Sequence, residues 1–184
     1  MGFNDIHTST GRLINPLEPE PDNIDIRDIA HALAMQVRWN GHARDFYSVA
    51  EHCVRVSMIC PAKDALYGLL HDAPEAYLSD VPGPIKKAEG FAFYREAEAR
   101  LMATIAKRFG LPERIPASVH RADAILLHTE ARDLFPSDHN KEWVDMALTQ
   151  PRRIAPLQSP KAAEAWFMER FKALERRRAK EAAA

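Results

Sequence analysis

The sequence contains little glycine and little cysteine, and its charges nearly cancel. Its 184 residues include 7 Gly, 2 Cys, 25 Lys+Arg and 26 Asp+Glu, for a formal net charge of −1. A balanced charge argues against binding a nucleic acid polymer through bulk positive charge. Scarce glycine, together with few runs of Val, Ile and Thr, disfavours a sheet-rich fold. With 46% hydrophobic and 28% charged residues, the composition is that of a helical globular domain.

Signals for membrane insertion and secretion are also missing. No run approaches the roughly 18 apolar residues that a membrane-spanning helix requires. The N-terminus lacks the basic and apolar regions of a secretory signal. Cys53 and Cys60 lie on one expected helix and cannot form a disulfide without unwinding it. These absences predict a cytoplasmic protein with reduced thiols and no membrane partner.

Hydrophobic spacing predicts a single all-α domain, 1–184, built as a bundle of seven or more helices. Residues 1–25 are expected to form an extended N-terminal arm, and 160–184 a C-terminal helix with a frayed tail. Asp25, Ser48 and Asp64 are expected to cap helix N-termini. Helices are predicted at about 27–38, 48–60, 65–70, 91–109, 116–135 and 160–180, with short ones at 85–88 and 142–148.

The dipeptide His71-Asp72, at the end of a short apolar helix, carries the strongest chemical signal. Adjacent side chains on a helix point about 100° apart, so both reach one point only if it lies between them, as a metal ion would. Imidazole nitrogen with carboxylate oxygen suits Mn, Fe, Co, Ni, Zn or Mg. Taken alone, the pair could equally be surface polar residues at a helix break.

Four further polar residues lie beside apolar helix positions or shortly after His71. His52 and Asp123 interrupt apolar stretches, where a carboxylate costs free energy unless it is paired or ligates a metal. Glu75 follows His71 by one helical turn and is expected on the same side of one helix, and Asp80 follows in a loop. A converging set of this kind is difficult to explain as solvated surface.

Each of these residues also has a simpler interpretation. His52 could be a core histidine, and Asp123 could form a helix-surface ion pair with a neighbouring arginine. Glu75 could belong to a solvated helix face, and Asp80 could cap the turn that follows it.

The order His52, His71-Asp72, Asp123 resembles the HD superfamily of metal-dependent phosphohydrolases, over roughly residues 27–135. The segment HDAPEAYLSDVPGPIKK is similar to the corresponding segment of bacterial 5'-deoxynucleotidases. The resemblance implies an HD-domain helical bundle that holds one divalent metal ion, with four ligands: His52, His71, Asp72 and Asp123. It also implies that Glu75 orients or deprotonates the attacking water, and that Asp80 acts as an acid or contacts the sugar.

Candidate substrate-binding residues lie upstream and downstream of this set. Arg38-Trp39 resembles a pair in the deoxynucleotidases whose Arg lies near the phosphate and whose Trp lies near the base. Lys86 is a second candidate cation, and His42 follows in a Gly-His turn. That turn departs from the deoxynucleotidase pattern, and the runs TSTGRLINPLEP and RWNGH look closer to a bacterial and phage HD subgroup. Glu130 is expected behind the site or on the surface.

The function expected from the resemblance is hydrolysis of a phosphoester in a small-molecule nucleotide, such as a 5'-(deoxy)nucleoside monophosphate. Nucleoside triphosphate and alarmone hydrolases are alternatives; the alarmone enzymes carry an acidic pair after HD, where this chain has Ala73-Pro74. A metal-containing nucleotide-binding module without turnover, or a structural dimer, remains open. Apolar stripes on 91–109 and 160–180 are compatible with a homodimer.

Overall fold

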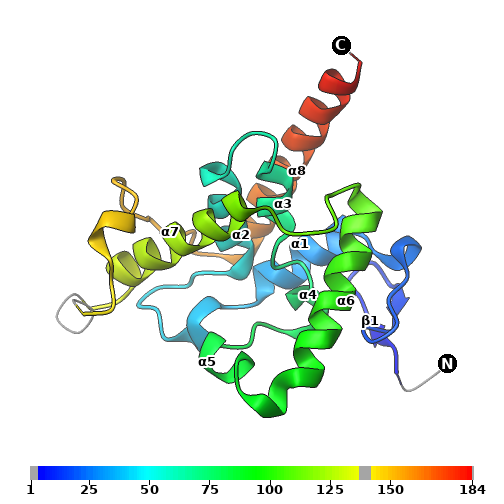
Figure 1. Ribbon diagram of the computed structural model, residues 1–184, viewed down its shortest axis with the longest axis horizontal. Coiled ribbons are helices and arrows are strands. Elements are labelled where there is room, and N and C mark those ends of the chain that lie inside the picture. Colours follow the sequence, from blue (N-terminus) through cyan, green and yellow to red (C-terminus); the bar gives the residue numbers. More distant parts are fainter. Residues whose placement is uncertain (1–3, 137–141, 184) are drawn as a thin grey trace.

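The computed structural model describes residues 4–136 and 142–183, and this part of the chain is an all-α bundle, as predicted (Figure 1). The α-helices are α1 (Ile26–Met35), α2 (Val49–Ile59), α3 (Ala65–Leu70), α4 (Glu75–Leu78), α5 (Gly83–Lys86), α6 (Ala92–Phe109), α7 (Ala117–Leu134) and α8 (Pro160–Ala182). Short 3-10 helices are η1 (Pro21–Asn23), η2 (Arg38–Gly41), η3 (Glu89–Phe91) and η4 (Met146–Leu148). The strands are β1 (Ile6–His7) and β2 (Leu13–Ile14).

Helix α2 lies at the centre of the bundle and packs against α1, α3, α7 and α8. Its side chains Val49, Val54 and Val56 are fully buried, and so is the polar His52. Ser48 caps the helix as predicted, because its hydroxyl accepts a hydrogen bond from the amide of Glu51 at 3.1 Å. Any functional group carried by α2 is therefore held by packing on several sides.

The N-terminal arm is more ordered than an extended segment. Strands β1 and β2 form an antiparallel hairpin with Ile6 opposite Ile14, a pairing that the sequence analysis did not predict. The carboxylate of Asp28 on α1 accepts from the Ser9 hydroxyl and from the Thr10 amide and hydroxyl, each at 2.7 Å. These bonds tie the hairpin to α1.

Helix α1 ends at Met35, three residues before the predicted end. The next residues are extended: the carbonyl of Gln36 accepts from the Val49 amide at 3.1 Å, and the Arg38 amide donates to the carbonyl of Tyr47 at 2.9 Å. This pairing with the segment before α2 replaces the hydrogen bonds that would have continued the helix. It also brings the Arg38-Trp39 pair close to α2.

Three local predictions are wrong. Asp64 makes no capping bond, because its carboxylate instead accepts from the Ser118 hydroxyl of α7 at 2.6 Å. The expected helix at 142–148 reduces to η4, and the short helix predicted at 85–88 lies at Gly83–Lys86, directly after Pro82.

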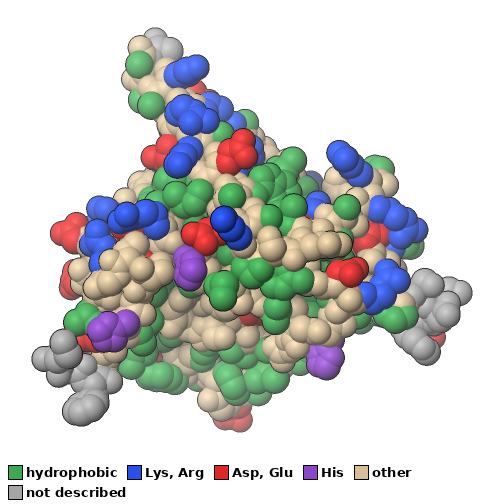
Figure 2. Space-filling view, turned by 180° about the vertical axis from the view of Figure 1, so that it is seen from behind, with side chains coloured by type: hydrophobic (Ala, Val, Ile, Leu, Met, Phe, Trp, Pro, Cys, Tyr) green, Lys and Arg blue, Asp and Glu red, His purple; other side chains and the backbone are tan. Residues whose placement is uncertain are grey.

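Helix α8 packs through Ala163, Phe167 and Leu174 against α1, α2 and α3. The apolar stripe that was compatible with a homodimer is thus buried within the chain, as are Ala97 and Leu101 of α6. The end of α8 projects from the body and carries Lys and Arg side chains (Figure 2). The helix continues to Ala182, and residue 184 of the expected tail lies outside the described residues. No helix in the described ranges is long and apolar enough to cross a membrane.

Gly68 allows α3 to approach α2 closely. A Cβ atom at this position would lie 2.7 Å from the Cys60 sulfur and 3.2 Å from the Cα of Ser57. We predict that Gly68→Ala lowers the free energy of unfolding by about 1–3 kcal/mol through overpacking, although alanine is the better helix former by about 1 kcal/mol. Urea denaturation measures the change.

Gly83→Ala is the matched control, because nothing lies within 4 Å of a Cβ built there. Its stability should stay within about 0.5 kcal/mol of the parent. A Gly68→Ala protein as stable as the parent would contradict the close approach of the two helices.

Candidate metal centre

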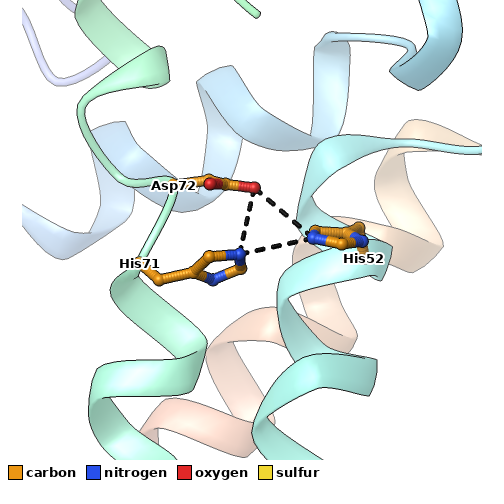
Figure 3. Close-up of side chains that lie close together, drawn as sticks. All are labelled: His52, His71 and Asp72. Carbon is orange, nitrogen blue, oxygen red and sulfur yellow. Dashed lines mark hydrogen bonds and ion pairs between the residues drawn. The ribbon is translucent and has the colours of Figure 1, made fainter. Parts of the chain in front are cut away.

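Three side chains meet where the first turn of α2 lies beside the C-terminal end of α3. His52 projects from α2, whereas His71 and Asp72 follow directly after α3 (Figure 3). The Nε2 atoms of the two imidazoles lie 3.3 Å apart. Oδ2 of Asp72 lies 3.5 Å from Nε2 of His52 and 3.3 Å from Nε2 of His71. Ligand atoms at roughly 2.0–2.2 Å from a metal ion lie roughly 3.0–3.5 Å from one another, so the triangle has the right size.

The hydrogen bonds of the two imidazoles explain why both Nε2 atoms are free to bind. Nδ1 of His71 lies 2.8 Å from the carbonyl oxygen of Gly68, and Nδ1 of His52 lies 2.6 Å from Oε1 of Glu130. Both partners are acceptors, which assigns the ring protons to Nδ1. When both rings are neutral, two Nε2 lone pairs face each other, an arrangement that a cation between them stabilises. His52, His71 and Asp72 can therefore hold a metal ion.

Asp123 of α7 lies beside the same triangle. Its Oδ1 is 3.2 Å from Nε2 of His52 and 4.0 Å from Nε2 of His71. Burial acts to raise the pKa of Asp123, but the hydrogen bond to His52 and the charge of His71 outweigh it and lower that pKa. The structure thus brings together all four side chains that the resemblance implied as ligands.

The local conformation around His71 differs from the one that the sequence analysis assumed. Helix α3 ends at Leu70, His71 is its C-cap, and a turn leads to α4, which begins at Glu75. The expectation that Glu75 shares one continuous helix with His71 is therefore wrong. The turn places Asp72 next to the imidazole of His52.

Glu75 is buried and forms an ion pair with the ammonium group of Lys86. Burial, together with the negative charges of Asp72 and Asp80, raises the pKa of Glu75 to about 9. Its Oε1 lies 3.4 Å from Nζ of Lys86, which also contacts Glu98 at 2.6 Å. Its buried Oε2 has no hydrogen-bond partner among the described residues. This oxygen is available to a water molecule or a ligand.

Gln36 connects the two candidate catalytic residues, and the sequence analysis missed it. Its amide nitrogen donates to the carbonyl of Glu75, and its amide oxygen accepts from the backbone N–H of Asp80, both at 2.9 Å. No local signal could have marked Gln36, because these partners are 39 and 44 residues away.

A pocket of about 610 Å³ opens beside Gln36 and Asp80, and the exposed His42 lies on it. The backbone near this pocket is strained: Trp39, Asn40 and Ser79 have φ angles of 59°, 49° and 72°. Residues held in such conformations cluster at ligand sites, where surrounding contacts enforce them. The structure places His42 and Asp80 on this pocket, whereas Lys86 lies beside Glu75.

Arg38 and Trp39 converge on Glu130 behind the ligands. Nε of Arg38 donates to Oε2 of Glu130 at 3.0 Å, and Nη1 lies 3.8 Å from Oδ2 of Asp72. Nε1 of Trp39 donates to the same Oε2 at 3.1 Å. Burial acts to raise the pKa of Glu130, but Arg38 and His52 outweigh it and lower that pKa to about 2. Glu130 is therefore an ionised carboxylate inside the protein.

The pKa of His52 is raised, whereas that of Glu130 is lowered. Burial and the charge of Arg38 act to lower its pKa, whereas Glu130 and the hydrogen bond to Asp123 raise it to about 9. Without a metal, His52 therefore carries a proton on both ring nitrogens at neutral pH, and a divalent cation that binds Nε2 would take the place of one of these protons.

Comparisons with known proteins define a family for the chain. It is 39% identical over 153 residues to the uncharacterized protein YfdR of Escherichia coli strain K12, an alignment that spans 82% of this chain and 84% of YfdR. It is 41% identical over 138 residues to an uncharacterized protein of Rhodobacter capsulatus, spanning 68% and 70% of the two chains. No protein-family model matches the chain. The chain belongs to the same family as YfdR.

We predict that the protein, stripped with a chelator, binds one equivalent of Mn²⁺ or Zn²⁺ in a calorimetric titration. Asp72→Asn removes a negatively charged ligand and should lower the affinity at least about tenfold. The control is Glu96→Gln, which neutralises an exposed carboxylate of α6 and should bind like the parent. Equal affinities of Asp72→Asn and the parent would rule out this location for the metal.

Proposed function

We propose that this protein is a metal-dependent phosphohydrolase of the HD superfamily that hydrolyses a nucleotide phosphoester, such as a 5'-(deoxy)nucleoside monophosphate. The observation that carries the proposal is the pair of facing imidazole Nε2 atoms at 3.3 Å, with carboxylate oxygens of Asp72 and Asp123 beside them. Two imidazoles and two carboxylates form a ligand set that suits several divalent ions.

His52, His71, Asp72 and Asp123 would hold a divalent ion, which could be Mn, Co, Ni, Fe, Mg or Zn. When bound, the ion would supply positive charge that polarises the phosphoryl group and acidifies the attacking water. Arg38 adds a fixed positive charge on the same side, since its guanidinium lies 3.8 Å from Asp72. These groups oppose the negative charge that develops on the phosphate.

Glu75 is the proposed general base. Its pKa of about 9 keeps the group protonated at neutral pH without a metal, and a bound cation would add to the charges of Lys86 and Arg38 that favour the carboxylate. In that form its free Oε2 can accept a hydrogen bond from the attacking water. The water oxygen forms a bond to phosphorus, its proton passes to Glu75, and the phosphorus–oxygen bond to the sugar breaks. Lys86 lies 3.4 Å from Oε1 and steadies the charged form of Glu75.

Asp80 is the proposed donor of a proton to the departing sugar oxygen, or a contact to the sugar. Burial raises its pKa, an effect that Arg38 partly offsets. It lies on the same pocket as His42, so that pocket is the proposed location of the nucleoside. Trp39 is the proposed wall of the base subsite, beside the strained residues of η2.

The proposal predicts metal-dependent release of phosphate from one class of nucleotide. The chelator-stripped protein is reloaded with each divalent ion in turn and assayed with deoxy- and ribonucleoside mono- and triphosphates and guanosine tetraphosphate. Glu75→Gln should keep the metal but lose about 10²–10⁴-fold in kcat, because the base is removed. Asp72→Asn should lose both metal and turnover.

Glu96→Gln serves as the active control in the same assay. Turnover that survives chelation, or that Asp72→Asn retains, would refute the mechanism. One bound metal equivalent with no turnover of any substrate would instead favour a nucleotide-binding module.

A further inference from the structure

We propose that Glu130 is a positioning residue that couples metal binding by His52 to the conformation of the Arg38-Trp39 segment. The part of this inference that concerns substrate rests on the proposed function. The part that concerns metal binding rests only on the geometry of the candidate metal centre.

All hydrogen-bonding capacity of the Glu130 carboxylate is used by four donors. Oε1 accepts from the Tyr47 hydroxyl at 2.9 Å and lies 2.6 Å from Nδ1 of His52. Oε2 accepts from Nε of Arg38 at 3.0 Å and from Nε1 of Trp39 at 3.1 Å. The side chain has no solvent exposure. A buried carboxylate with four donors holds each of them in one geometry.

One oxygen of this carboxylate, Oε1, contacts the metal-site residue His52, and the other, Oε2, contacts the segment proposed to bind substrate. The bond from His52 fixes its proton on Nδ1 and turns the Nε2 lone pair toward His71 and Asp72. The bonds from Arg38 and Trp39 hold η2, where Trp39 has a φ angle of 59°. Because the carboxylate is planar and rigid, a change in the bonds to one oxygen moves the whole group and changes the bonds to the other oxygen.

Substitution by glutamine exposes this dual role, because all four partners donate. An amide nitrogen in place of Oε2 would face the N–H groups of Arg38 and Trp39, neither of which can accept. An amide nitrogen in place of Oε1 would force His52 to move its proton to Nε2, where it blocks metal binding. Either orientation disturbs the site while the shape of the side chain stays the same.

Calorimetric titration of the stripped protein with Zn²⁺ tests the coupling without any substrate. Glu130→Gln should lower the Zn²⁺ affinity about 10–100-fold, the usual effect of removing a group that orients a metal ligand. Glu51→Gln is the matched control: Glu51 is also a fully buried carboxylate, but its oxygens accept from Arg55 and from the Leu157 amide. It should keep the Zn²⁺ affinity of the parent.

Trp39→Phe provides a second, milder variant that keeps a ring against Phe135 but removes the N–H donor. Trp39 is not among the candidate metal ligands, yet the coupling predicts that this variant loses roughly fivefold in Zn²⁺ affinity. The matched control is Trp143→Phe, since the Trp143 ring contacts Trp39 at a centroid distance of 5.8 Å but is not one of the four described donors to Glu130. Circular dichroism verifies the fold of every variant.

Three results would overturn the inference: Glu130→Gln binding Zn²⁺ like the parent, Trp39→Phe matching Trp143→Phe, or a parent protein that binds no metal. Should Glu130→Gln fail to fold, the comparison of the two Trp variants decides. A protein that shows these affinity changes but hydrolyses no nucleotide would leave the coupling standing and contradict the proposed function alone.

Discussion

An ionised carboxylate without solvent contact is the constraint on which the candidate site depends. Transfer of such a charge from water into a protein costs several kcal/mol unless hydrogen bonds and opposite charge compensate it. For Glu130 the compensation comes from Arg38, Trp39, Tyr47 and His52, which lie on η2, on the segment before α2 and on α2 itself. These elements must therefore meet α7 at one point for the chain to fold. The same requirement orients His52, so that burial of one charge organises both the fold and the site.

Close packing around α2 supplies the rest of the geometry. Gly68 brings α3 against α2, and its carbonyl then accepts from the ring of His71, which aims the second imidazole at the first. Because one fold hosts many activities, the case for a phosphohydrolase depends on these side chains rather than on the bundle.

The site has a rigid side and an accessible side. His52 is fully buried, whereas the side chains of Asp72 and Asp123 are 20% and 41% exposed. The two carboxylates are thus the more solvent-accessible part of the cluster, whereas Asp80 and the strained residue Ser79 line the neighbouring pocket.

Local sequence determined the helices and named the residues of the site, whereas only tertiary structure decided how they are held. The helical spacing of hydrophobic residues and the caps at Asp25 and Ser48 predicted most helices, because these signals depend only on residues a few positions apart. The order of His and Asp residues predicted a group that the fold does bring together. The early end of α1, the bridging role of Gln36 and the burial of Glu130 could not be predicted. Their partners lie 9 to 92 residues away in the chain, and hydrogen bonds across that separation exist only after the helices have packed.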